Sequence, residues 1–585
     1  MKKFIIFIII IAVITVIHVN EIYASGIQGD ADGNGVVNSV DYFYYVASVN
    51  GGHVPSSVNL DFNEDGEVGL FDRAIIISHI SNPTPTPTSA LGKTNLPPGI
   101  YVYYDWESLD PAVYPWIKGG EIATRWNLIE PEEGTMSWTD LEKWIDNNAR
   151  KNKGITLKIT AHDRDYSGIP NWIYARHNVP KIKIGDQNCS YNSNCFYPKW
   201  WDTNFINKYT NMIKRVGEKY NNDPRIGAII VAIGEYGEAF PGYGNLSWDT
   251  TPKNHDQYWE EAGLTPDIWI NYSKKIIDAY VKAFPNKLLF LLEQAFEGKN
   301  NDALTDYAAS SGVNMGFAGL TADNDHNSRW YTPFSKYVET GTLLGRLEQG
   351  YGGSISPRLV YWSALNALRN HAYIISFYGQ PNKDQANSET LNFANKYAGT
   401  KIKDTPGAWI AFKGKPGDDV IWQGHEGNYE FWIKQINPET TTLPVFDWDK
   451  PNQTLKNAGT KEGMYSRKTD LSTGKNTFYL NIYDQYVSAL NNARFNTLVI
   501  GKQAKITVKY LNNNNGQIVV KYDSFSGAKT AGIVTKTNTN TWESVSFTVT
   551  DAYFNNRLNN NSDITITASG ENATLHMVEV EIEQP

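Results

Sequence analysis

Cysteine is nearly absent from this chain, with only Cys189 and Cys195 among 585 residues. A small fold held together by many disulfides is therefore excluded. Five residues separate the two cysteines, and outside the cell we expect them to form one disulfide that closes a small loop. Two free thiols are the alternative, and these two residues alone do not make a metal site.

The chain also lacks an excess of basic residues. It has 53 Lys and Arg against 62 Asp and Glu, which gives a net charge of −9 and a pI near 5.7. Nucleic acid and anionic membrane surfaces attract basic patches, so neither is expected as a partner. After residue 20 no apolar run is long enough to suggest a membrane span.

The N-terminus has the pattern of an export signal. Lys2 and Lys3 precede an apolar run from Phe4 to Ile17, and small residues around Ala24 offer a cleavage site. An uncleaved anchor is the alternative, but the run is shorter than the ~20 residues of a spanning helix. We therefore expect residues 1–25 to be a signal peptide and the protein to be secreted and extracellular.

Aromatic residues are abundant, with 18 Trp, 35 Tyr and 23 Phe. Flat rings pack against the C–H faces of sugars, and they also fill large protein cores, so both interpretations stay open. A chain of this length is expected to form roughly three or four domains.

Two loops near the N-terminus have the spacing of calcium-binding EF-hand loops, with glycine (Gly35 and Gly66) at the sixth position. Both end in Asp instead of Glu and run into a helix-like apolar segment. The first would bind calcium through Asp30, Asp32, Asn34, the Val36 carbonyl, Asn38 and Asp41. The second would use Asp61, Asn63, Asp65, the Glu67 carbonyl and Asp72.

This pair of loops resembles dockerin domains, the modules that bind enzymes to cohesin domains of a cellulosome scaffold. The resemblance implies a helical dockerin over residues 26–82, structural calcium and a cohesin partner. Ser39 and Val40 in one loop correspond to Leu70 and Phe71 in the other, so the two halves present different recognition residues. The Pro/Thr-rich stretch that follows, within residues 83–96, is expected to be an extended linker.

Residues 97–400 alternate strand-like and helix-like segments, which predicts a parallel (β/α)8 TIM barrel. In such barrels the chemistry lies at the C-terminal ends of the strands. Polar residues collect there: Asp105, Arg125, Glu130, His162, Asp163, Glu235, Glu293 and Glu348. The eight expected strands span residues 99–106, 121–131, 154–163, 226–235, 287–294, 313–321, 342–350 and 372–379.

Two carboxylates across a cleft suffice for glycoside hydrolysis, and the fourth and seventh strands end in Glu235 and Glu348. The segment from Trp126 to Ile159 resembles clan A glycoside hydrolases. "GEYG" at 234–237 and "LEQGYGG" at 347–353 are similar to the acid/base and nucleophile motifs of family 42 β-galactosidases. The resemblance implies that Glu235 is the acid/base and Glu348 the nucleophile of a retaining enzyme, with carboxyl groups about 5–5.5 Å apart.

One position departs from the clan pattern, because Gly234 stands where these enzymes usually have Asn. Glu238 is therefore kept as an alternative acid and Glu293 as an alternative nucleophile, and each carboxylate could instead form a structural ion pair. Residues expected to contact substrate are Trp106, Arg125, Trp126, His162, Asp163, Trp330 and Tyr378. No cofactor is expected for catalysis.

The C-terminal region is rich in strands. Residues 401–443 are expected to close the barrel or to form a small β extension, and residues 444–585 an antiparallel β-sandwich. The sandwich is similar to jelly-roll modules of carbohydrate enzymes, and it could bind carbohydrate or be structural. We therefore expect a secreted, cellulosome-associated retaining glycoside hydrolase of plant cell-wall polysaccharide. The alternatives are a carbohydrate-binding pseudoenzyme and a structural scaffold component.

Overall fold

The computed structural model describes fifteen parts of the chain and divides it into two units, residues 1–89 and 90–585. The signal segment, both calcium loops (residues 30–41 and 61–72), Trp106, Cys189, Cys195, Trp330 and Tyr378 lie outside the described residues. These comprise Leu60 and residues 96–102, 110–163, 168–185, 196–243, 253–293, 302–317, 319–322, 345–348, 357–377, 383–401, 404–413, 427–441, 461–484 and 503–582.

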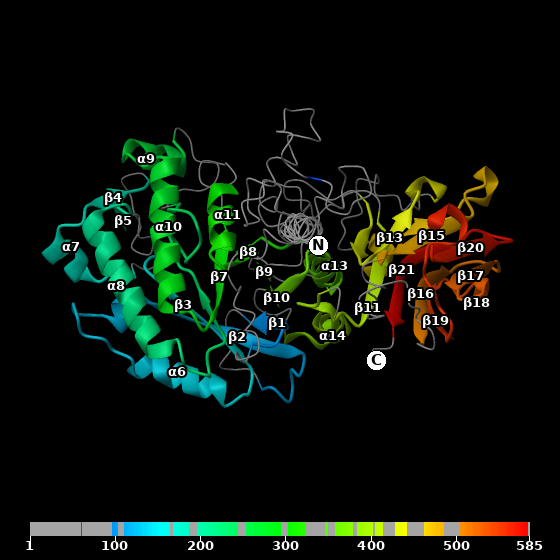
Figure 1. The fold of residues 1–585 in the computed structure, drawn as a ribbon, viewed down its shortest axis with the longest axis horizontal. Helices are drawn as coiled ribbons and strands as arrows, with labels where there is room; N and C mark the ends of the chain where they lie inside the picture. Colours follow the sequence, from blue (N-terminus) through cyan, green and yellow to red (C-terminus); the bar gives the residue numbers. More distant parts are fainter. Residues whose placement is uncertain are drawn as a thin grey trace, which may run out of the picture. The chain divides into compact units, whose positions relative to one another are not determined.

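The second unit contains a closed barrel of eight parallel strands in the order β1-β10-β9-β8-β7-β6-β3-β2 (Figure 1). Each of the eight predicted strands is present, so the barrel prediction is confirmed. The second strand begins earlier than expected and ends at Arg125, where a short helix replaces the predicted continuation. The strands are Gly99–Val102, Ile117–Arg125, Gly154–Thr160, Ala228–Ile230, Leu288–Glu293, Asn314–Phe317, Gly345–Glu348 and Ala372–Ser376.

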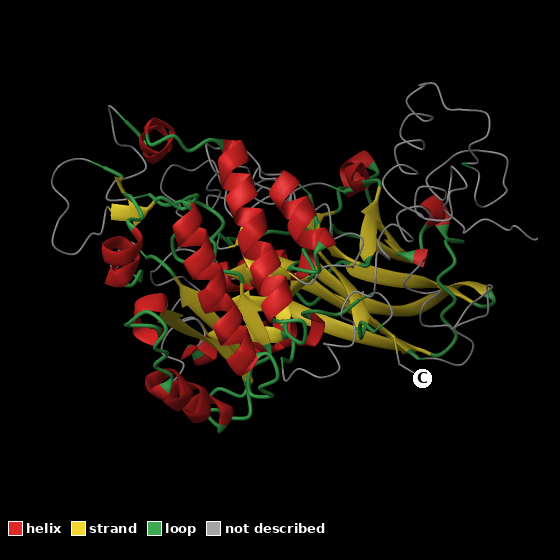
Figure 2. Ribbon diagram, turned by 60° about the vertical axis from the view of Figure 1, so that its left-hand side comes forward, coloured by secondary structure: helices red, strands yellow, loops and turns green. Residues whose placement is uncertain are grey.

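Helices cover the outside of the barrel, as Figure 2 shows. Two of them start with ordinary capping chemistry: the Asp202 carboxylate accepts from the backbone N–H groups of Asn204 and Phe205, and Thr265 caps a helix with Pro266 at its first position. The helices are α5 (Trp126–Ile129), α6 (Thr139–Ala149), α7 (Asn171–His177), α8 (Thr203–Tyr220), α9 (His255–Glu261), α10 (Pro266–Ala283), α11 (Asp302–Ser310), α13 (Pro357–Arg369) and α14 (Ser388–Tyr397).

Among the described residues, the barrel interior combines an apolar layer with a buried ion pair. Tyr101, Phe290 and Ile374 belong to the apolar layer. Above it, the Lys158 ammonium lies 2.8 Å from the Glu121 carboxylate, and both side chains are almost fully buried. A buried charge is tolerated only when it has a partner, so this pair fixes β2 against β3.

Two antiparallel sheets that share an apolar core form the C-terminal part. One sheet has the order β12-β11-β21-β16-β19 with β14 beside β21, and the other has the order β13-β15-β20-β17-β18. These strands are β11 (Gly407–Ala411), β12 (Tyr429–Phe431), β13 (Ile433–Ile436), β14 (Arg467–Lys468), β15 (Thr477–Ile482), β16 (Ala504–Asn512), β17 (Gln517–Ser524), β18 (Gly527–Thr535), β19 (Thr541–Val549), β20 (Ile564–Ser569) and β21 (Thr574–Ile582).

The strands within residues 401–443 belong to this sandwich. β11 pairs with β21 and β13 pairs with β15, so the expected small extension supplies strands to both sheets. The sandwich therefore begins at Gly407 instead of residue 444.

The sandwich is joined to the barrel through buried aromatic residues. Trp409 and Phe431 stack with ring centroids 5.5 Å apart, and both belong to the same apolar core as the barrel helices. Across the same boundary the Tyr361 hydroxyl on α13 lies 2.7 Å from His576 Nε2 on β21. Burial lowers the pKa of His576 to about 4, so this bond joins two neutral groups at physiological pH.

Replacing the shared core residue Trp409 should destabilise both parts together. Trp409→Ala leaves a cavity in a fully buried position and is expected to cost about 3–5 kcal/mol of unfolding free energy. Chemical denaturation followed by fluorescence and circular dichroism would measure this loss. Phe525→Ala, at a ring that is 58% exposed, is the control with a much smaller effect. A second transition that the Trp409 substitution leaves unchanged would contradict the shared core.

Candidate active site

The fourth barrel strand, β6, leads into a tight hairpin that carries two glutamates. Glu235 forms a single parallel bridge with His162, beyond the end of β3, and Glu238 forms one with Leu292 of β7. Between them Tyr236 and Gly237 have φ values of 57° and 79°, and the Glu238 N–H donates to the Glu235 carbonyl over 3.0 Å. Two consecutive residues with positive φ are typical of a two-residue hairpin turn. The turn places Glu235 on the β3 side and Glu238 on the β7 side.

Gly234 is required by the close return of this hairpin. A Cβ atom at this position would lie 1.8 Å from the Phe240 carbonyl oxygen and 3.2 Å from Trp269. No side chain fits, and the asparagine that clan A enzymes usually have before the acid/base cannot be accommodated on this backbone. The departure seen in the sequence therefore has a packing cause.

Five buried aromatic side chains, here called the aromatic frame, hold residues 232–242 by hydrogen bonds to backbone carbonyls. Tyr209 donates to Ala232 over 2.8 Å and Tyr272 to Ile233 over 2.9 Å. The three indoles donate to Ala239, Pro241 and Gly242 over 2.7–3.1 Å. The frame consists of Trp200, Tyr209, Trp259, Trp269 and Tyr272.

The Glu235 side chain is fully buried and accepts a hydrogen bond on each oxygen. The Tyr197 hydroxyl donates to Oε1 over 2.5 Å, and the Tyr243 backbone N–H donates to Oε2 over 2.9 Å. Tyr197 comes from β5 (Phe196–Pro198), which pairs with β4 (Lys181–Lys183) in a separate two-stranded sheet. Both donors fix the orientation of the carboxylate.

His162 packs against Tyr197 and does not face solvent. Its ring is fully buried and stacks on Tyr197 with centroids 4.1 Å apart, and Nε2 lies 3.1 Å from the Phe196 carbonyl oxygen. Burial lowers the pKa of His162 to about 4, so the neutral ring donates its Nε2 proton to that carbonyl. The expectation that His162 contacts substrate is thereby corrected to a role in positioning Tyr197.

Trp126 and Glu130, at the end of the second strand, are core residues. The Trp126 indole is fully buried beside Trp172 and Tyr209, and its Nε1 donates to Glu130 over 2.8 Å. Arg215 on α8 makes an ion pair of 3.0 Å with Glu130. These contacts correct the expectation that Trp126 lines the substrate site.

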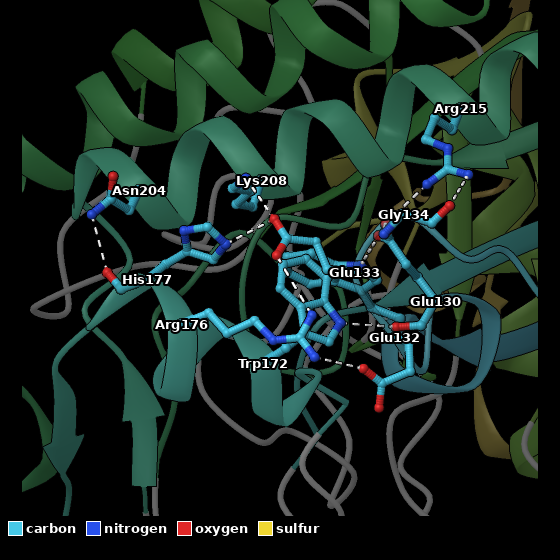
Figure 3. A network of polar contacts seen from close by, with 11 residues as sticks. Glu130, Glu132, Glu133, Gly134, Trp172, Arg176, His177, Asn204, Lys208 and Arg215 are labelled. Atoms are coloured by element: carbon cyan, nitrogen blue, oxygen red, sulfur yellow. Dashed lines mark hydrogen bonds and ion pairs between the residues drawn. The ribbon is translucent and has the colours of Figure 1, made fainter.

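Figure 3 shows the polar network around Glu130 and the loop that follows it. Glu133 lies between α7 and α8, where it accepts from Lys208 and contacts His177 at 2.8 Å each. These partners hold the pKa of Glu133 below its usual range. The network ties the loop after α5 to both helices, and it is structural.

The remaining predicted residues lie at strand ends. Glu348 is the last residue of β9 and pairs with Ser376, the last residue of β10. Glu293 ends β7 and pairs with Phe317. The side chains of both glutamates are outside the described residues. Arg125 ends β2, and the partly exposed Asp163 follows β3, so both lie on the C-terminal side of the barrel sheet.

Sequence comparison decides the class of chemistry. Residues 108–240 match the family model described as beta-galactosidase, glycoside hydrolase family 42. This segment is that of a glycoside hydrolase. The matched segment includes Glu235 and Glu238 and ends before Tyr243. No curated protein sequence matches the chain.

Solved structures of similar fold have low sequence identity. The catalytic domain of beta-amylase from Paenibacillus polymyxa has 10% identity and a TM-score of 0.38, over 52% of this chain and 99% of that one. A beta-galactosidase from the psychrophilic Marinomonas ef1 has 11% identity and a TM-score of 0.35, over 51% of this chain and 59% of that one. Native xylanase 10B from Thermotoga maritima has 14% identity and a TM-score of 0.32, over 53% and 97%.

The chain therefore covers less than two thirds of the length of that beta-galactosidase. The barrel is assigned from the order and pairing of its own strands. Structural similarities at this low identity do not identify a substrate.

Sequence reasoning missed the residues that hold Glu235. Tyr197 and the aromatic frame carry no local motif, because each contributes one group to a hairpin 17–41 residues away in the chain. Tyr243 is near in sequence but contributes its backbone N–H, which no side-chain pattern reveals. The only sequence signal for Tyr197 and the aromatic frame was the high aromatic content, and their rings are buried in the core.

A side chain at position 234 should disrupt the hairpin. Gly234→Ala forces the Phe240 backbone to move and is expected to cost about 3 kcal/mol or more of unfolding free energy. Gly474→Ala is the control, because Gly474 has a φ of 78° but no atom within 4 Å of an added Cβ, so only about 1–2 kcal/mol of backbone strain is expected. Equal losses in denaturant titrations would contradict the steric argument.

Proposed function

We propose that the barrel is a retaining glycoside hydrolase of plant cell-wall polysaccharide or its oligosaccharides, with β-galactosides as the first substrates to test. The observation that carries the proposal is the Glu235 carboxylate, held by two hydrogen bonds at the end of the fourth barrel strand inside the matched segment. The seventh strand ends at Glu348. In this proposal Glu235 protonates the leaving oxygen and Glu348 attacks the anomeric carbon.

Tyr197 and Tyr243 act as positioning residues in this proposal. By holding both oxygens of Glu235, they limit rotation of a carboxyl group whose proton must reach one substrate oxygen. After Glu348 has formed the glycosyl-enzyme, the same carboxylate takes a proton from the attacking water. Glu238 and Glu293 remain the alternative acid and nucleophile.

Substitution of the two glutamates tests this division of roles. Glu235→Gln is expected to lower kcat on polysaccharide by about 10²–10⁴-fold, the usual contribution of general acid–base catalysis. For an aryl glycoside whose leaving group needs no proton, the kcat/KM of Glu235→Gln should fall far less. This ratio reports formation of the glycosyl-enzyme, the step in which the leaving group departs. Glu348→Gln should lower kcat on polysaccharide and kcat/KM on the aryl glycoside by similar factors. Reducing-sugar release and aryl-glycoside kinetics would measure these effects.

Glu132→Gln is the matched control, because the Glu132 side chain is 67% exposed on the nearby loop. It should leave both rates unchanged. Full activity in Glu348→Gln would move the nucleophile to Glu293, which the corresponding variant would then show. Full activity in Glu235→Gln would move the acid to Glu238 in the same way.

Carbohydrate binding without cleavage is a second candidate function. It is favoured by the full burial of Glu235, by the two donors that already occupy its oxygens and by the absence of room for an asparagine at position 234. Polysaccharide binding by a wild-type protein that releases no reducing sugar from any substrate would establish it.

We further propose that the protein is secreted and that residues 26–82 are a calcium-loaded dockerin that binds a cohesin domain. The support is the repeated ligand spacing in the two loops and the export pattern before them. Carboxylate-rich loops of this kind fold around the ion, so calcium should order the cohesin-binding surface.

Calcium removal should abolish cohesin binding. A chelator, or the pair Asp30→Ala and Asp61→Ala, is expected to eliminate capture by a panel of immobilised cohesin domains, and added calcium should restore it only in the wild type. Asp140→Ala, in the first turn of α6, is the control with normal capture. Capture that survives the chelator would refute the dockerin assignment.

A further inference from the structure

A solvent-accessible cavity of about 390 Å³ lies between the barrel and the sandwich, away from the hairpin with Glu235. Helix α14 forms one wall, and β16, β19 and β21 form the opposite wall, on the side of the barrel where α13 and α14 adjoin the sandwich (Figure 1). Its volume falls within the roughly 300–1,000 Å³ of small-molecule sites. Asn392 and Ser544 are exposed on opposite walls, so the cavity opens to solvent.

The charges around the cavity are paired. Lys396 lies 2.8 Å from Glu579, Lys461 lies 3.1 Å from Glu389, and Lys509 lies 2.6 Å from Glu462. Each ammonium group has a carboxylate partner, so the cavity has no surplus of positive charge to attract an anion. It instead presents fixed donors and acceptors side by side, which suits a ligand that is polar and uncharged.

The cavity also has an apolar part. Phe393 and Met577 line it, Phe393 is half-buried, and Tyr361 contributes a buried ring. A wall that combines a ring with amide, hydroxyl and charged groups matches a sugar, which has C–H faces and hydroxyl edges.

Hydrogen bonds fix the positions of the walls. On the sheet side, β16 pairs with both β19 and β21, and Thr507 in the cavity wall lies 2.8 Å from Ser546. On the barrel side, the Tyr361–His576 hydrogen bond fixes α13 to β21. The cavity therefore lies between two surfaces whose positions are fixed by contacts within the chain.

From these features we infer that the cavity binds a neutral oligosaccharide, as a second carbohydrate site separate from the barrel mouth. The site would hold a polysaccharide strand on the same compact unit that carries Glu235. The inference does not depend on which residues cleave the substrate, or on whether the barrel cleaves it at all.

Filling the cavity tests the inference. In the full chain with Glu348→Gln, isothermal titration with cellotetraose, xylotetraose and β-1,4-galactotetraose should detect two sites for at least one of these probes. Ser544→Trp places an indole in the cavity from an exposed position and should remove one site. Phe393→Ala should weaken the same site at least tenfold.

Thr548→Trp is the matched control, because Thr548 is exposed on the same face of β19 but does not line the cavity. It should keep both sites. Turnover of a small aryl glycoside by the wild-type background should be the same with and without Ser544→Trp. If no turnover exists, the hydrolase proposal fails, while loss of one binding site in Ser544→Trp would still support the second site.

Three results would overturn the inference. They are no binding of any neutral probe, binding sites that all persist in Ser544→Trp and Phe393→Ala, and tighter binding of tetragalacturonate than of the neutral probes. The last result would mean that the paired lysines select an anion.

Discussion

The hydrogen bonds from the aromatic frame to the backbone of residues 232–242 are the constraint on which the candidate site depends. A loop of eleven residues at a barrel mouth would otherwise expose many carbonyl groups to solvent. Here five of these carbonyls accept from indole and phenol groups that are buried between α8, α9 and α10. The frame thus converts helix packing outside the barrel into a fixed position for Glu235.

The frame gives a structural role to part of the high aromatic content of the sequence. Trp200, Trp259 and Trp269 are fully buried, and each donates its indole N–H to a backbone carbonyl. An indole supplies large apolar area together with one donor, so it can fill a core and hold a loop at once.

The sequence allowed the barrel to be predicted because each strand is a short apolar run bounded by turn-forming residues, such as the runs that contain Ile155 and Phe290. It also allowed the glutamate at the end of the fourth strand to be found, since position along a strand fixes its end of the barrel. It could not identify Tyr197, because its contact with Glu235 spans 38 residues and depends on a two-stranded sheet outside the barrel. His162 and Trp126 were misplaced for a related reason: a strand end locates the backbone but not whether neighbouring helices bury the side chain.

The close approach between Gly234 and Phe240 means that the residue types at these two positions depend on each other. A relative that carries an amide side chain at this position needs a different path for its counterpart of Phe240, so the two positions must change together. Chains that share this glycine are therefore expected to share the return of the hairpin.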